Sequence, residues 1–144
     1  MKNLCTVIAV MVAMGIAIWG CGKKEEPAAS DMAALQGTWI GHVVGEQQAE
    51  CKLILKADTF EFSGPDAEET RYKGTYVLYE QAEPKAADFH IQECGIPEYA
   101  GKVAKGIYTI DGDTFTFSSD EPGSEIRPAE FGTDFPTFVL TKQK

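Results

Sequence analysis

From residue 36 onward, apolar and polar residues alternate with a period of two in short runs. Leu53 and Leu55, for example, alternate with Lys52 and Lys56. This alternation is typical of strands with one buried and one solvated face. The runs are rich in β-branched and aromatic residues and occupy residues 37–44, 51–57, 59–63, 70–79, 87–93, 105–110, 113–119 and 137–142.

Turn signals separate these runs at short intervals. Asp111-Gly112 stands between two alternating runs, where glycine supplies the positive φ that a tight hairpin needs. Ala57-Asp58 marks a second, weaker hairpin. Many short strands in succession, with no helical period after Leu35, predict an all-β fold. We expect a small up-and-down antiparallel barrel of about eight strands, which leaves no exposed sheet edge.

The N-terminus is patterned differently. Lys2 precedes an almost wholly apolar run, residues 4–18, after which the chain turns abruptly polar. A basic start, a short apolar stretch and a small residue before the cleavage site indicate a secretory signal peptide. The run is shorter than the ~20 apolar residues of a comfortable membrane-spanning helix. We expect residues 1–20 to be removed.

Cys21 directly follows Gly20 and resembles the lipidated cysteine of the bacterial lipoprotein lipobox. Ile18 and Gly20 fit that pattern, whereas Trp19 is bulkier than usual at its position. The resemblance implies that Cys21 carries lipid and anchors the chain to a membrane of the cell envelope, facing the periplasm or exterior. The alternative is an ordinary cleaved signal, or an uncleaved anchor, with Cys21 incidental.

Residues 21–34 form the predicted tether between the anchor and the domain. The segment after Cys21 mixes charge, Pro27 and small residues, a composition typical of a flexible spacer. A helical turn over residues 31–35, capped by Ser30 or Asp31, fits its end. Residues 35–144 then make one barrel domain.

The cysteines divide between these parts. Cys5 leaves with the signal peptide and Cys21 is the lipid site, so that Cys51 and Cys94 remain as an even pair in an exported domain. Exported proteins can keep disulfides, and we predict one between Cys51 and Cys94. Two separate buried thiols are the alternative.

The chain is acidic, with a net charge of −9, and loss of Lys2 with the signal peptide makes it more so. Nucleic-acid binding needs clustered Lys and Arg, so we expect no nucleic-acid partner. An acidic surface does attract cationic partners. One hypothesis is therefore a protein-binding module, such as an inhibitor of a cationic envelope enzyme. We expect the domain to be a monomer.

Two motifs resemble known barrels. A Gly-x-Trp at the first strand, here Gly37 to Trp39, resembles the lipocalin and wider calycin group. In that group the indole lies across the closed end of the barrel under a cation, here Lys142 or, less favourably, Arg127. The segments LQGTW, YKGTYVL, GIYTIDGDTFTF, EIRPAEF and FVLTK also resemble, in order and spacing, a planctomycete-type lipocalin-like domain family of unknown function. This resemblance implies a lipocalin-like barrel and no activity.

The inward aromatic residues are the candidate ligand contacts. They either fill the barrel or line a narrow apolar cavity, because small eight-stranded barrels do one or the other. The leading hypothesis is binding of a small hydrophobic ligand without catalysis. The candidate residues for this binding are Trp39, Tyr72, Tyr76, Phe89, Tyr108 and Phe117.

The remaining polar residues suggest little chemistry. His42 and His90 lack any recognised ligand spacing, so we expect no metal site and no cofactor. The serines lack a nucleophile elbow, and the acidic runs are typical of solvated loops, so we expect no catalytic residues. In residues 125–136, Arg127 lies between Glu125 and Glu130. We expect an ion pair within this loop that packs it over a barrel end.

Overall fold

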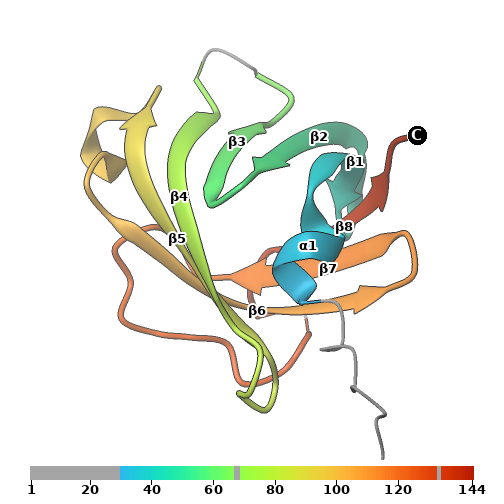
Figure 1. Cartoon of the computed structure of the whole chain (residues 1–144). Coiled ribbons are helices and arrows are strands. Elements are labelled where there is room, and N and C mark those ends of the chain that lie inside the picture. The colour runs from blue at the N-terminus through green and yellow to red at the C-terminus, as the bar shows by residue number, and fades with distance from the viewer. Residues whose placement is uncertain (1–29, 67–68, 133) are drawn as a thin grey trace, which may run out of the picture.

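In the part of the chain that the structure describes, eight antiparallel strands form a closed barrel, preceded by one short α-helix (Figure 1). The computed structural model describes residues 30–66, 69–132 and 134–144. The predicted signal peptide, Cys21 and residues 21–29 of the tether lie outside the described residues. The elements are α1 (Asp31–Leu35), β1 (Gly37–Val43), β2 (Glu46–Lys56), β3 (Thr59–Ser63), β4 (Arg71–Tyr79), β5 (Ala86–Cys94), the 3-10 helix η1 (Pro97–Tyr99), β6 (Val103–Asp111), β7 (Thr114–Ser119) and β8 (Thr137–Lys142).

Each strand pairs with its successor, and β1 pairs with β8 to close the sheet. Trp39 of β1 lies opposite Leu53 of β2 on one side and Lys142 of β8 on the other. The predicted all-β, up-and-down antiparallel barrel is therefore confirmed. β2 begins at Glu46, ahead of the predicted start at residue 51, because its first residues continue the pairing with the end of β1.

Both predicted hairpin turns are confirmed. Asp111 pairs with Thr114, and Gly112 between them has a φ of 58°. In the β2–β3 hairpin, Ala57 takes a φ of 52°, a left-handed conformation that is uncommon for a residue with a Cβ. These turns hold neighbouring strands in register, which fixes the side chains that point into the barrel.

The connections alternate between the two ends of the barrel. We call the end with α1 and the β2–β3, β4–β5 and β6–β7 turns the closed end, and the end with the other four connections the open end. The Gln36 side chain ties α1 to the β2–β3 turn at the closed end. Its Nε2 donates to the Met32 carbonyl at 2.9 Å and to the Ala57 carbonyl at 3.0 Å.

α1 belongs to the barrel domain, although residues 31–34 fall within the predicted tether. The predicted helical turn is present, and the Ser30 hydroxyl caps it by accepting from the Ala33 amide at 3.3 Å. Leu35 is fully buried, and its carbonyl accepts from Trp39 Nε1 at 2.8 Å. Asp31 accepts from Lys85 Nζ at 2.7 Å and from the Tyr108 hydroxyl at 2.8 Å. These contacts hold α1 against the closed end of the barrel.

The Asp31 contacts also set the charge at the closed end. Burial alone would raise the pKa of Asp31, but the hydrogen bonds from Lys85 and Tyr108 outweigh it and hold this pKa below its usual value. Burial, together with the hydrogen bond to Asp31, raises the pKa of Tyr108. At neutral pH an ionised carboxylate therefore faces a protonated phenol and a lysine.

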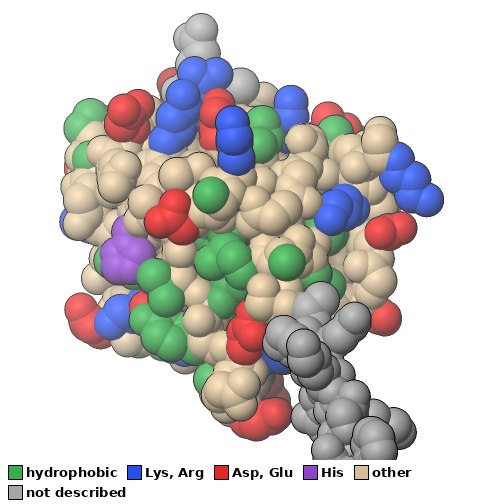
Figure 2. Space-filling model, in the orientation of Figure 1, with side chains coloured by type: hydrophobic (Ala, Val, Ile, Leu, Met, Phe, Trp, Pro, Cys, Tyr) green, Lys and Arg blue, Asp and Glu red, His purple; other side chains and the backbone are tan. Residues whose placement is uncertain are grey.

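The outer surface mixes charged and apolar side chains. Figure 2 shows acidic and basic side chains scattered over one face, with hydrophobic side chains grouped among them near its middle. Val77 and Tyr79 of β4 are large hydrophobic residues with more than a third of their surface exposed, at 42% and 45%. Exposed apolar surface of this extent is ordinary on folded domains.

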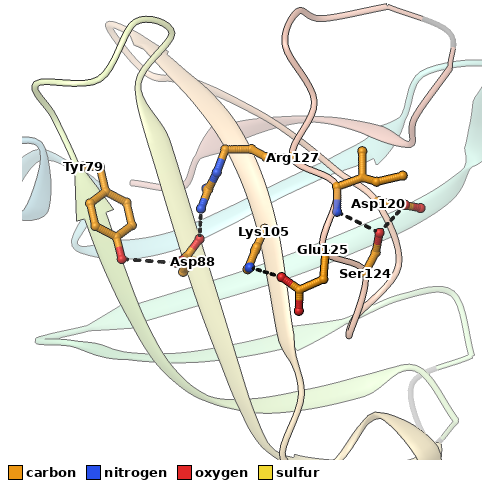
Figure 3. Close-up of polar contacts among 8 residues, drawn as sticks. Tyr79, Asp88, Lys105, Asp120, Ser124, Glu125 and Arg127 are labelled. Carbon is orange, nitrogen blue, oxygen red and sulfur yellow. Dashed lines mark hydrogen bonds and ion pairs between the residues drawn. The ribbon is translucent and has the colours of Figure 1, made fainter.

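The connection between β7 and β8, residues 120–136, lies mainly against the outer wall of the barrel (Figure 3). Arg127 Nη2 contacts Asp88 Oδ1 on β5 at 2.6 Å, and Arg127 Nη1 donates to the Gly106 carbonyl on β6 at 2.8 Å. The predicted ion pair of Arg127 within its own loop is therefore wrong. The guanidinium reaches across β5 and β6 because it can satisfy a carboxylate and strand carbonyls together there. Glu125 instead contacts Lys105 Nζ at 2.7 Å.

The predicted disulfide between Cys51 and Cys94 is also wrong, since both are free thiols in the structure. Cys51 lies on β2 and Cys94 ends β5, with β3 and β4 between them. Neighbouring strands lie about 4.8 Å apart. Three such steps separate the two residues, well beyond the roughly 7 Å between Cα atoms that a disulfide tolerates. Burial, with Glu46 and Glu50 nearby, raises the pKa of the Cys51 thiol.

Candidate functional site: the pocket at the open end

The interior of the barrel is filled at the closed end and hollow at the open end. Trp39, Tyr76, Tyr108 and Phe115 are each no more than 1% exposed and pack together with Leu35. Beyond them lies an apolar pocket of about 360 Å³. The sequence left open whether the interior is filled or hollow, and the structure shows both, one at each end.

Aromatic rings form most of the pocket wall. Phe89 makes edge-to-face contacts with Phe60 and with Phe117, each with ring centroids 4.9 Å apart. Phe62 and Phe138 make a similar contact at 5.5 Å. Edge-to-face packing holds each ring in place without filling the centre of the barrel. The lining consists of Leu53, Phe60, Phe62, Tyr72, Phe89, Ile91, Tyr99, Ala104, Phe115, Phe117, Ser119, Asp120, Glu121, Pro122, Pro136, Phe138 and Leu140.

Small residues on β6 create the space. Ala104 lines the pocket, and Gly106 lies two residues further toward the closed end, so both share the inward face of the strand. A Cβ at Gly106 would overlap the ring of Phe117 and the carbonyl oxygen of Ser118. The ring of Phe117 therefore lies against the backbone of β6, which leaves the volume in front of Ala104 empty.

The predicted ligand contacts divide between the two ends. Tyr72, Phe89 and Phe117 line the pocket. Trp39, Tyr76 and Tyr108 do not, because they are buried in the closed end and their polar atoms are used there. The Tyr76 hydroxyl, for instance, donates to the Ala57 carbonyl at 2.9 Å.

Sequence reasoning missed five aromatic residues of the lining: Phe60, Phe62, Tyr99, Phe115 and Phe138. Period-two alternation around Glu61 could have identified two of them, Phe60 and Phe62, as residues on the inward face of β3. Phe62 pairs with Leu53 on β2 and with Tyr72 on β4, and both of these partners also line the pocket. Tyr99 had no such signal, because it lies in η1 within the β5–β6 connection, outside any predicted strand.

The mouth of the pocket is polar on the side formed by the end of β7 and the loop after it. Ser119, Asp120 and Glu121 line this side. Hydrogen bonds from Ser124 Oγ at 2.6 Å and from the Glu121 amide at 2.8 Å hold the pKa of Asp120 below its usual value. The Tyr99 hydroxyl donates to Glu121 at 3.3 Å, and burial together with this nearby carboxylate raises the pKa of Tyr99.

A second, shallower hollow of about 480 Å³ lies on the outer wall, where residues 127–129 meet the β4–β5 turn and β6. The guanidinium of Arg127 lies 5.8 Å from the centre of the Tyr79 ring, and the Tyr79 hydroxyl donates to Asp88 at 3.2 Å. The Asp88 carboxylate raises the pKa of Tyr79. Because Arg127 and Asp88 already satisfy one another, we interpret this hollow as a packing feature of the loop.

The two histidines lie apart from the pocket lining. His42 on β1 pairs with Val139, and His90 on β5 pairs with Thr75 and Val103. Among the described residues, no three His, Cys, Asp or Glu side chains gather as a metal ion would need. Within those same residues, the structure contains no helix with the length and apolar character required to cross a membrane.

Comparison of the chain with models of protein families, with curated proteins and with solved structures gives no match. The geometry of the Gly-x-Trp segment can nevertheless be compared with what the lipocalin resemblance implies. Trp39 lies at the closed end, and Lys142 Nζ lies 5.5 Å from the centre of its ring. Arg127, the other candidate cation, lies over Tyr79 instead. The function must therefore be argued from the pocket itself.

Proposed function

We propose that this chain is a lipid-anchored protein of the cell envelope whose barrel binds a small hydrophobic ligand in the pocket at its open end. The observation that carries the proposal is the apolar pocket of about 360 Å³ inside a closed barrel. Ligand pockets typically measure about 300–1,000 Å³ and are lined mainly by apolar and aromatic side chains. Apolar space inside a protein can accept apolar molecules.

The construction of the barrel supports this function. The closed end is sealed by fully buried side chains and by α1, so a ligand enters from the open end only as far as Phe115, Leu53 and Leu140. Rigid rings give a preformed site, which reduces the ordering cost of binding. The residues that line the pocket come from both the strands and the loops at the open end.

A substitution that fills the pocket tests the proposal. Ala104→Phe places a ring in the empty volume, so we expect the full chain to bind the neutral fluorescent probe phenylnaphthylamine at least tenfold more weakly. The free energy of unfolding should change by no more than about 1 kcal/mol, because the ring occupies existing space. Fluorescence titration and urea denaturation measure the two quantities.

Thr109→Phe is the matched control, because Thr109 is exposed on the same strand and lies on the outward face. This variant should bind the probe as the unchanged chain does. Equal probe binding by the folded Ala104→Phe and Thr109→Phe variants would place the probe outside the barrel and refute the proposed binding site.

The anchor is tested separately in cells. Cys21 supplies the thiol that lipidation requires, so Cys21→Ser should move the expressed chain from the membrane fraction to the soluble fraction. Cys5→Ser is the control, since Cys5 belongs to the segment that we expect to be removed. A Cys21→Ser chain that still fractionates with membranes would show that another feature holds it there.

A further inference from the structure

The mouth of the pocket contains a buried hydroxyl that no other described group uses. Ser119 ends β7 on the same face as Phe115 and Phe117, lines the pocket and is 7% exposed. Its amide donates to the Pro136 carbonyl at 3.3 Å. The serine hydroxyls of this region that bond to other described residues are those of Ser118 and Ser124, and Ser119 Oγ is not among them. Fully enclosed side-chain oxygens in the described residues all have partners. Because Ser119 lines the pocket, its Oγ is available to a polar group placed there.

Two carboxylates follow this hydroxyl. Asp120 is fixed by Ser124 Oγ and by the Glu121 amide, which keep it ionised at neutral pH. Glu121 accepts from the Tyr99 hydroxyl across the mouth. The described residues that line the pocket include no Lys, Arg or His. Lys102 lies against Gly123 in the same loop but is not part of the lining.

We infer that the ligand is an amphiphile whose polar end is a protonated amine, held at the mouth between the Ser119 hydroxyl and the carboxylates of Asp120 and Glu121. This inference rests on the proposed function and specifies its ligand class. The apolar body of such a molecule fills the aromatic pocket. An ammonium group donates to the hydroxyl and is attracted by both carboxylates, whereas a fatty-acid carboxylate would meet two like charges.

The size of the preference for an amine over a carboxylate depends on how exposed the mouth of the pocket is. Glu121 is exposed, so water and salt screen its attraction for a ligand charge. The preference should therefore be a several-fold difference in affinity, and it should shrink as salt is added. A difference of several orders of magnitude would require carboxylates buried much more deeply than these.

Competition among decylamine, decanol and decanoate tests the inference, because they share one apolar chain and differ in the polar end. Each is titrated against phenylnaphthylamine bound to the full chain at neutral pH and low salt. We expect decylamine to bind at least fivefold more tightly than decanoate, with decanol between them. Ser119→Ala should weaken the binding of decylamine and of decanol severalfold. Glu121→Gln should reduce the ratio of decylamine affinity to decanoate affinity about twofold or more.

Asp113→Asn is the matched charge control, because it removes an exposed carboxylate in the β6–β7 turn at the closed end. This variant should leave the order of the three affinities and the ratios between them unchanged. Equal binding of amine and acid, or tighter binding of decanoate, would overturn the amine assignment while leaving the proposed function in place. Failure of all three compounds and of the probe to bind would overturn the proposed function, and the amine assignment with it.

Discussion

Replacing Trp39 with alanine should lower the free energy of unfolding by about 3–5 kcal/mol, the usual cost of emptying a large buried aromatic site. Trp39 has no exposed surface, and its ring lies 5.8 Å from that of Phe115. Its Nε1 donates to the Leu35 carbonyl, so the substitution also releases α1 from β1. Stability is only about 5–15 kcal/mol for a typical domain, so this loss is a large part of the total.

Two milder variants separate the contributions at this site. Trp39→Phe keeps a ring but loses the hydrogen bond to Leu35, so it should cost less than alanine. Lys142→Met removes the cation over the ring and should cost about 0.5–2 kcal/mol. Urea denaturation at neutral pH gives all three values. A loss below about 1 kcal/mol for Trp39→Ala would show that the indole does not hold the closed end together.

Much of the barrel could be predicted from local sequence, because the alternation of apolar and polar residues within a strand indicates which of its faces is buried. Leu53 and Leu55 of β2 are inward and buried, as their alternation with lysines predicts. The turn at Gly112 was predictable for a similar local reason, since few residues accept its positive φ. Strands that follow one another through short turns leave few topologies to choose from.

The pocket could be predicted only in part, because alternation identifies inward residues but not their height in the barrel. Tyr72 and Tyr76 lie on one face of β4, yet Tyr72 lines the pocket and Tyr76 fills the closed end. Whether space remains between inward side chains depends on packing across the barrel. The place of Phe117 against Gly106 of a neighbouring strand is one such detail.

Long-range polar pairs were the least predictable feature. The partner of Arg127 is Asp88, which lies 39 residues away in sequence, and nearby Glu125 and Glu130 looked equally suitable from the sequence alone. Similarly, Cys51 and Cys94 looked suited to a disulfide until the strand order placed β3 and β4 between them. Both errors arose from judging pairs by residue type before their positions in the barrel were known.

Replacing Arg127 with methionine should lower the free energy of unfolding by about 2–4 kcal/mol. Asp88 has a side chain only 11% exposed, and the substitution leaves its buried carboxylate without its cation. The Gly106 and Ala87 carbonyls, which accept from Arg127 at 2.8 and 3.3 Å, also lose their donor. The loss should be smaller in the Asp88→Asn background, because no buried charge is then left unpaired.

Lys105→Met is the matched control for this loop. It breaks the ion pair of Lys105 with Glu125, whose side chain is 88% exposed, so it should cost at most about 1 kcal/mol. Denaturation gives the energies, and limited proteolysis reports the loop itself. We expect faster cleavage within residues 120–136 in Arg127→Met than in Lys105→Met, since Arg127 holds the loop to β5 and β6. Equal cleavage and equal stability of the two variants would mean that apolar contacts, such as those of the buried Pro128, hold the loop in place.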